Sequence, residues 1–209
     1  MGYPNLAAEA HTSGAMSFMT MPDVILRLPD WVEAFLADQP QTCPRIEQRM
    51  EMAVALAHKN IEHGTGGPFG AVVFEHDTGR WIGLGVNLVT GLNCSLFHAE
   101  AVALALAQAR LGTFDLAAHG RYQLVSSCEP CAMCLGAIGW AGVCGVVCGA
   151  RDEDARAVGF DEGDKPAGWP AALKRRGVEI VQDVLRDRAV EVLRLYAARG
   201  GLIYNPRRP

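Results

Sequence analysis

The sequence predicts an α/β fold in which one sheet carries helices on both faces. Short apolar stretches typical of strands alternate with longer stretches whose apolar residues repeat at helical spacing. Half of the 209 residues are hydrophobic and 20% are charged, the composition of a globular protein with a sizeable core. Since no repeat or linker divides the chain, we expect one domain over residues 26–209. Residues 1–25 show no periodicity and are expected to form a loose extension.

The regular pattern begins at residue 45. Apolar residues at helical spacing predict a helix over about 46–61, between Pro44 and Gly64. The stretch GGPFGAVVFEHDTGRWIGLGVN is typical of two strands around a turn at Asp77-Thr78-Gly79. The next stretch, HAEAVALALAQAR, is apolar nearly all round, which predicts a buried helix.

The second half of the chain continues the alternation. RYQLVSS and VCGVVCGA are expected to be strands, and between them PCAMCLGAIGWAG is expected to be a helix that starts with Pro130 and ends at Gly142. An irregular stretch over 151–168 should follow. The chain should then end with a short helix near 170–176, a strand at VEIV, and a helix over about 183–199 that the pair Gly200-Gly201 stops.

Charge, hydropathy and cysteine content disfavour a nucleic-acid partner, a membrane span and an oxidising compartment. The 19 basic residues against 23 acidic ones give a net charge of −4, whereas nucleic-acid binders usually carry a basic surplus. No apolar run approaches the roughly 18 residues of a membrane span, and the first thirty residues lack a secretory signal. Seven cysteines, an odd number, favour reduced thiols. We therefore expect a cytoplasmic protein with neither a nucleic-acid nor a membrane partner.

A Cys-x-x-Cys pair at Cys131 and Cys134 raises the question of chemistry. A redox pair would normally follow the first strand of a thioredoxin-like pattern, near the N-terminus. A structural zinc site would need two more closely spaced Cys or His ligands, and the sequence offers no second such pair. The remaining interpretation is a catalytic zinc with three protein ligands and one open position.

The third ligand would be His98, which is followed by Glu100 inside an otherwise apolar helix. A buried carboxylate costs several kcal/mol unless it is compensated. The alternative is that Glu100 is simply exposed in the first helical turn, where the helix dipole favours it. His-x-Glu followed by Pro-Cys-x-x-Cys is the signature of zinc deaminases. In that chemistry one zinc per chain activates water, and Glu100 transfers the protons.

The other cysteines and Trp140 are not part of this metal-binding motif. Trp140 is expected to be core or pocket wall. Small, buried, apolar roles are expected for Cys43, Cys94, Cys128, Cys144 and Cys148.

Over residues 45–209 the sequence resembles the cytidine deaminase superfamily, and within it the guanine deaminase branch. The resemblance rests on GGPFGAVVFE, HAEAVALALAQA, SSCEPCAMCLGAIGWAGV, AVGFDEG and GGLIYN. It implies a three-layer α/β/α sandwich with a mixed five-stranded sheet, usually as a homodimer in which the C-terminal segment can be exchanged. It also implies zinc-dependent hydrolysis of guanine to xanthine and ammonia. Some members of this group also deaminate the triazine ammeline.

The resemblance further implies a substrate pocket. Asn87 would contact the base through its amide, Phe69 would stack on the ring, and the backbone at Ala99 would join the same wall. Glu162 would contact the base and take part in proton transfer, and Tyr204 would close the pocket. By residue type and position alone, Asn87 could instead be a strand-end turn residue, Phe69 plain core, and Glu162 a solvated loop acid.

Rival functions use the same metal motif. A tRNA adenosine deaminase would need a basic surface, which the net charge disfavours. A cytosine or nucleoside deaminase is the second rival. A non-catalytic zinc-stabilised binding module would be expected to fill the fourth ligand position or to lack Glu100, and this chain does neither.

Overall fold

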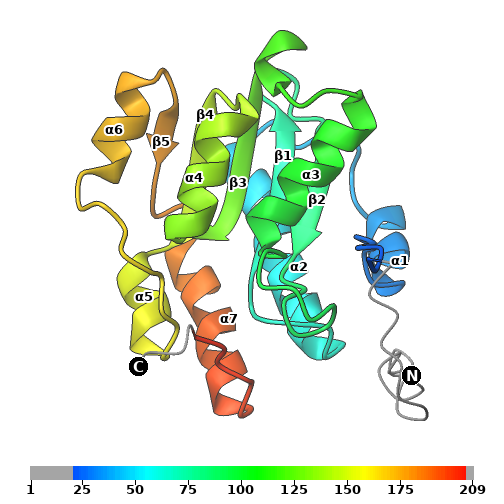
Figure 1. The fold of residues 1–209 in the computed structure, drawn as a ribbon, viewed down its shortest axis with the longest axis vertical. Helices are drawn as coiled ribbons and strands as arrows, with labels where there is room; N and C mark the ends of the chain where they lie inside the picture. Colours follow the sequence, from blue (N-terminus) through cyan, green and yellow to red (C-terminus); the bar gives the residue numbers. More distant parts are fainter. Residues whose placement is uncertain (1–20, 206–209) are drawn as a thin grey trace.

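The computed structural model describes residues 21–205 and contains one five-stranded sheet between two layers of helices (Figure 1). The strand order is β2-β1-β3-β4-β5. Strand β1 pairs antiparallel with both β2 and β3, whereas β3, β4 and β5 run parallel. The expected mixed sheet is therefore confirmed. The strands span Gly70–Glu75 (β1), Trp81–Val86 (β2), Tyr122–Cys128 (β3), Gly145–Ala150 (β4) and Glu179–Val181 (β5).

Helices cover both faces of the sheet. The helices α3 and α4 lie on one face, with α6 beside β5, and α2 and α7 lie on the other (Figure 1). The short α1 packs into the core on the α2 side, and α5 contacts α7. The helices span Trp31–Ala37 (α1), Ile46–Glu62 (α2), Ala99–Leu111 (α3), Ala132–Ala141 (α4), Asp152–Ala157 (α5), Trp169–Arg175 (α6) and Arg186–Ala198 (α7), with a 3-10 turn at Leu116–Ala118.

The two cores follow from the period-2 alternation of the strands. In β1, Val72 and Phe74 face the core beneath α2 and α7, while Ala71 and Val73 face the core beneath α3 and α4. All four side chains are fully buried. A sheet buried on both faces explains why these strands consist almost entirely of apolar residues.

Two glycines of β2 let α3 lie unusually close to the sheet. A Cβ atom at Gly83 would lie 2.6 Å from the backbone nitrogen of Ala107, and one at Gly85 would lie 2.2 Å from the carbonyl oxygen of Ala99. No larger residue fits at either position without moving the helix. The glycines therefore set the short distance between α3 and the sheet, and with it the position of the first turn of α3, where His98 and Glu100 lie.

Several predicted boundaries were wrong. Helix α4 begins at Ala132 rather than at Pro130, because Cys131 is an extended N-cap residue (φ −66°, ψ 173°). Helix α7 begins at Arg186 rather than at residue 183, because Asp183 and Leu185 both have positive φ. The stretch 151–168, expected to be irregular, contains α5, and α6 begins directly after it.

The N-terminal segment differs from expectation in its last part. The expected loose extension over 1–25 lies mostly outside the described residues, and residues 21–29 contain no helix or strand. Helix α1 follows immediately and was not predicted. By length and apolar composition alone, the segment Ala99–Ala118 would suffice to cross a membrane, although no such run was expected from the sequence. In the structure its helix, α3, packs against β1 and β2 as a core helix.

Candidate active site

The candidate site lies where the first turns of α3 and α4 meet, beyond the carboxyl ends of the parallel strands β3 and β4 (Figure 1). Ligand sites in open α/β sheets occur at such edges. His98 is the N-cap of α3, and Cys131 is the N-cap of α4. Both helix N-termini carry partial positive charge, which favours thiolates and carboxylates at this point.

Three of the predicted residues form a ligand cluster. The donor atoms of His98, Cys131 and Cys134 all lie within 4.8 Å of one another. The Cys131 Sγ atom is 3.4 Å from the His98 Nδ1 atom. Ligands at zinc bond lengths of about 2.0–2.3 Å in a tetrahedron are separated by about 3.5 Å. The spacing and the donor set of one nitrogen and two sulfurs therefore fit a single zinc ion.

The cluster provides one anionic ligand for a dication, Cys131, whereas the hydrogen bond with Cys131 and burial raise the pKa of Cys134. The hydrogen bond from Cys134, together with that to His98, lowers the pKa of Cys131 to about 4 despite its burial. Burial lowers the pKa of His98, but the hydrogen bond and charge of Cys131 outweigh it, and the pKa is raised. Cys131 is therefore a thiolate at neutral pH, as a zinc ligand must be.

Glu100 lies against this cluster inside the protein. Its side chain is only 6% exposed, so the alternative of a solvated glutamate in the first turn of α3 was wrong. The Cys134 thiol donates a hydrogen bond to the Glu100 Oε2 atom at 3.5 Å. Burial, reinforced by the charge of Cys131, raises the pKa of the Glu100 carboxyl. A carboxyl so placed is suited to accept and return protons.

The open end of the β1–β2 hairpin supplies one wall of the pocket. Gly70 pairs with Val86 across the two strands, which brings the preceding Phe69 beside the following Asn87. The Asn87 N–H donates to the Phe69 carbonyl at 3.1 Å. Both side chains line a cavity that also contains His98, and Asn87 is only 1% exposed.

The loop after α5 supplies an acidic wall. Glu162 lines the same cavity and is only 6% exposed, so it is not a solvated loop acid. Burial, followed by the charges of Cys131 and Glu100, raises the pKa of Glu162 to about 8. The neighbouring Asp161 also lines the cavity, but it lies 3.5 Å from the guanidinium of Arg156.

The C-terminal segment lines the same cavity through Tyr204 and Asn205. The Asn87 amide donates a hydrogen bond to the hydroxyl of Tyr204, whose ring lies edge-on to that of His98 at 6.2 Å between centroids. Phe160 lies between Phe69 and Tyr204, with centroids 4.9 Å and 5.7 Å away. The cavity has a volume of about 290 Å³, near the lower limit of ligand pockets. It is therefore suited to one ring system rather than a larger ligand.

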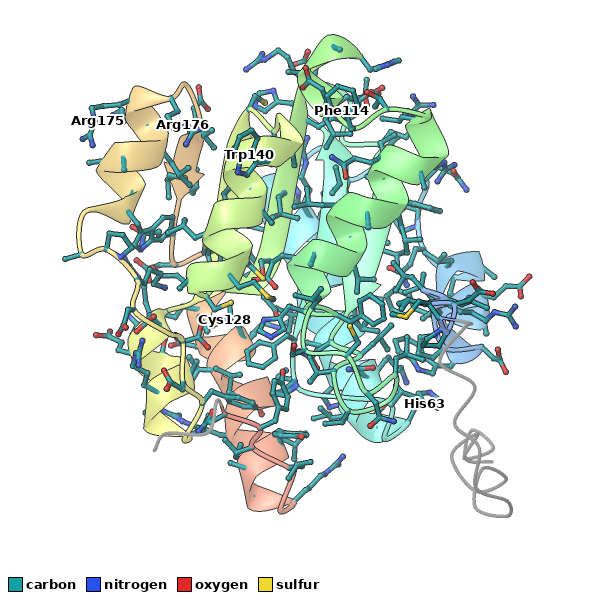
Figure 2. The ribbon with its side chains drawn as sticks, viewed as in Figure 1. His63, Phe114, Cys128, Trp140, Arg175 and Arg176 are labelled. Atoms are coloured by element: carbon teal, nitrogen blue, oxygen red, sulfur yellow. The ribbon has the colours of Figure 1, made fainter. Side chains whose placement is uncertain are left out.

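Other predicted residues occupy different positions. Ala99 is fully buried, and its carbonyl packs against Gly85 of β2. Trp140 is 86% exposed near the end of α4, so the prediction of core or wall was wrong (Figure 2). All seven cysteines are free thiols, but Cys94 and Cys144 are only partly buried because they lie in connecting segments.

Several residues in or beside the cavity were missed, among them Phe160, Asn205 and Lys165. Phe160 lies within the AVGFDEG motif, so the sequence contained the signal for this residue. Asn205 accepts a hydrogen bond from the Asp161 N–H at 2.8 Å and donates to the Gly159 carbonyl at 2.9 Å. Lys165 donates to the carbonyl of Pro130 at 3.1 Å. The contacts of Asn205 and Lys165 join segments far apart in sequence, so spacing alone could not reveal them.

A mixed sheet that holds a His-Cys-Cys cluster and a buried glutamate at two helix N-termini defines a zinc-dependent deaminase. Residues 44–150 match the cytidine and deoxycytidylate deaminase zinc-binding region, and the chain belongs to this family. It is 42% identical to the guanine deaminase of Bacillus subtilis (strain 168) over 127 residues, which are 58% of this chain and 78% of that protein.

Solved structures agree in fold. The guanine deaminase from Nitrosomonas europaea superposes with a TM-score of 0.80 at 43% identity, over 86% of this chain and 99% of that chain. The protein NE0047 in complex with 2,6-diaminopurine gives a TM-score of 0.80 at 44% identity, over 87% of this chain and 96% of that chain.

Proposed function

We propose that this protein is a guanine deaminase, which hydrolyses guanine to xanthine and ammonia. The observation that carries the proposal is the buried carboxyl group of Glu162 in the pocket lined by His98, Cys131 and Glu100. Glu129 is also buried at this pocket, but it is bound by Arg151 and the Asp152 N–H. The similarity to guanine deaminases and to a structure with a bound diaminopurine supports it.

The chemistry of guanine explains the need for Glu162. Guanine presents N1–H and the 2-amino group, both donors, on one edge. A carboxylate accepts hydrogen bonds from such an edge, whereas cytosine and adenine present an unprotonated ring nitrogen there. An unmatched buried polar group costs about 1–3 kcal/mol. In its deprotonated form, which a pKa of about 8 leaves partly populated near neutral pH, Glu162 therefore selects for guanine against these bases.

The remaining residues hold the base and move protons. Asn87 presents its amide to the base, Phe69 stacks on the ring, and Tyr204 closes the pocket, with the backbone at Ala99 behind this wall. When bound by His98, Cys131 and Cys134, zinc supplies Lewis-acid activation of water. Glu100 accepts one proton as water adds to C2 and delivers it to the purine ring. The proton of the new C2 hydroxyl is then taken up as the C2–N bond breaks, and Glu100 or Glu162 protonates the amine that leaves as ammonia.

A panel of substrates tests the proposal. Ammonia release is measured with guanine, ammeline, cytosine, cytidine, adenine, and tRNA that contains adenosine at the wobble position. Guanine is expected to give the highest kcat/KM. A higher value with cytosine would make the protein a cytosine deaminase, and inosine formation in the tRNA without xanthine from guanine would make it a tRNA deaminase.

We further propose that the protein is a cytoplasmic homodimer that buries the outer face of α4. This helix has the sequence AMCLGAIGWA, with no charged residue. Only Cys134, Ile138 and Ala141 are buried in the single chain, whereas Met133 is 37% exposed and Trp140 is 86% exposed. An exposed apolar helix face of this kind is typical of a protein interface. The free thiols agree with a reducing compartment.

A further inference from the structure

A fully buried amide lies behind the substrate wall, and no part of the proposed chemistry uses it. Asn60, in the last turn of α2, is 0% exposed. Its Nδ2 atom donates to the carbonyl of Gly67 and to the carbonyl of Asn87, both at 2.8 Å. Its Oδ1 atom accepts from the Thr65 hydroxyl at 2.6 Å. The side chain of Asn60 thus joins α2 to both segments that present Asn87.

These contacts control the side chain of Asn87 as well as its backbone. The Asn87 Oδ1 atom accepts from the N–H groups of Gly67 at 3.4 Å and Val89 at 3.3 Å. Gly67 is therefore held by Asn60 through its carbonyl and orients Asn87 through its N–H. A Cβ atom at Gly66 would lie 1.8 Å from the Asn87 carbonyl oxygen, so the two segments are in direct backbone contact.

The chain of hydrogen bonds continues into the N-terminal helix α1. The indole N–H of Trp31 donates to the Thr65 hydroxyl oxygen at 3.1 Å, so this hydroxyl can direct its own hydrogen to Asn60. The indole ring stacks on His63, with centroids 5.3 Å apart and planes 5° apart. Trp31 precedes the segment 44–150 that matches the deaminase family, and it lies 34 residues from Thr65 in sequence.

We propose that Asn60 is a positioning residue for Asn87, and that Trp31 acts on Asn87 through Thr65 and Asn60. The inference rests on the proposed function in one respect, namely that Asn87 contacts the base. Without Asn60, the buried Asn87 carbonyl loses the amide that donates to it, and the Gly67 carbonyl keeps only the Phe69 N–H at 2.9 Å. The Asn87 segment is then expected to shift until its carbonyl finds another donor. A misplacement of about 1 Å in a substrate-holding group can cost on the order of 100-fold in rate.

A double-mutant cycle separates this role from a merely structural one. The KM for guanine, the Kd of the guanine analogue 8-azaguanine, zinc content and Tm are measured for the parent, Asn60→Ala, Asn87→Ala and the double variant. We expect Asn60→Ala to raise KM and Kd about tenfold with unchanged zinc, and to change them less than about twofold when Asn87 is already alanine. Equal factors in both backgrounds, or an unchanged KM in the parent background, would overturn the proposal.

A matched control comes from another buried amide. Gln123, in β3, is 6% exposed and accepts a hydrogen bond from Arg49 at 3.1 Å, away from the pocket. Gln123→Ala should lower Tm, as Asn60→Ala does, but leave KM and Kd within about twofold of the parent. An equal rise in KM in both variants would show that loss of stability, not positioning, is being measured.

The Trp31→Phe variant tests the series of hydrogen bonds from Trp31 to Asn87 even if Asn60→Ala does not fold. Phenylalanine keeps a ring against His63 but has no N–H for Thr65. We expect KM and Kd to rise about two- to fivefold, and this rise to disappear in the Asn87→Ala background. An unchanged KM would overturn the role of Trp31. The double-mutant cycle in the Kd of 8-azaguanine needs no turnover, so it tests the role of Asn60 even if the protein does not deaminate guanine. A parent that releases no ammonia from guanine would refute only the proposed function.

Discussion

At the scale of single residues, the site is defined by groups whose environment changes their chemistry. Cys131 has a lowered pKa, and Glu162 has a raised one. These opposite shifts arise within one cavity, because hydrogen bonds favour the charged form of Cys131 whereas burial opposes that of Glu162. Groups of this kind concentrate at functional sites.

The metal cluster gives the first prediction at this scale. The purified protein should contain one zinc per chain, and Cys131→Ala combined with Cys134→Ala should remove it, because His98 alone cannot retain zinc. Elemental analysis measures this directly. The matched control is Cys144→Ala, since Cys144 is a partly exposed thiol just before β4. Undiminished zinc in the double variant would place the metal elsewhere.

Glu162 gives the second prediction. Glu162→Ala should lower kcat/KM for guanine at least tenfold, about 1.4 kcal/mol of transition-state stabilisation, with unchanged zinc. The control is Asp164→Ala, because Asp164 belongs to the same loop but is exposed. Steady-state kinetics decide the matter: guanine turnover within about twofold of the parent would mean that Glu162 neither recognises the base nor transfers protons.

At the scale of elements, the site depends on how α4 and the Glu162 loop are joined. The Ala132 N–H, at the start of α4, donates to the carbonyl of Glu162 at 2.9 Å. Lys165 then binds the Pro130 carbonyl and forms an ion pair with Asp152 at 2.8 Å. Its side chain is only 7% exposed. The loop is therefore attached at Glu162 and again at Lys165 to the segment that carries the zinc ligands.

This arrangement predicts an effect of Lys165 on catalysis from outside the pocket. Lys165→Met should lower Tm, because Glu129 and Asp152 lose the cation beside them. It should also lower kcat/KM for guanine about three- to tenfold, because the loop that carries Glu162 loses its attachment to Pro130. Zinc content should not change. Lys174→Met, at an exposed position in α6, is the control. A lower Tm with unaltered kinetics would show that Lys165 stabilises the fold without holding Glu162 in place.

Sequence patterns predicted the longer elements better than the short ones. The helix predicted over 46–61 is Ile46–Glu62 in the structure, because it has several turns of apolar periodicity. The helices α1 and α5, of seven and six residues, are too short for a periodic signal to exceed that of a loop. The zinc ligands stand within two short motifs and could be predicted. Asn60, Lys165 and Asn205 act through tertiary contacts, which the spacing of residues in the sequence does not reveal.

At the scale of the whole molecule, the outer face of α4 is an exposed apolar surface that a single chain does not explain. Apolar residues at helical spacing, Met133, Gly136 and Trp140, point away from the sheet. The sequence predicted Trp140 to be core or pocket wall, and the single chain leaves it exposed. In the proposed homodimer a second copy would bury this face, and stable interfaces bury about 1,200–2,000 Å².

The dimer can be tested by its mass in solution. Trp140→Glu should shift the protein from dimer to monomer, because a charge in an apolar interface costs several kcal/mol. Trp140→Phe, which stays apolar, should remain dimeric. Light scattering after size-exclusion chromatography gives the mass. A monomeric parent, or a Trp140→Glu variant that stays fully dimeric, would contradict the proposed interface.

Glu100 is proposed to transfer protons during zinc-dependent deamination of guanine. The most direct measurement is the rate of xanthine and ammonia formation from guanine by the parent and by Glu100→Gln at equal zinc content. Glutamine keeps the size of the side chain but cannot carry the proton. The parent should form equal amounts of xanthine and ammonia, and the rate of the variant should be lower by about 100-fold or more if Glu100 transfers the protons. No xanthine from the parent, or a near-parental rate in the variant, would contradict this proposal.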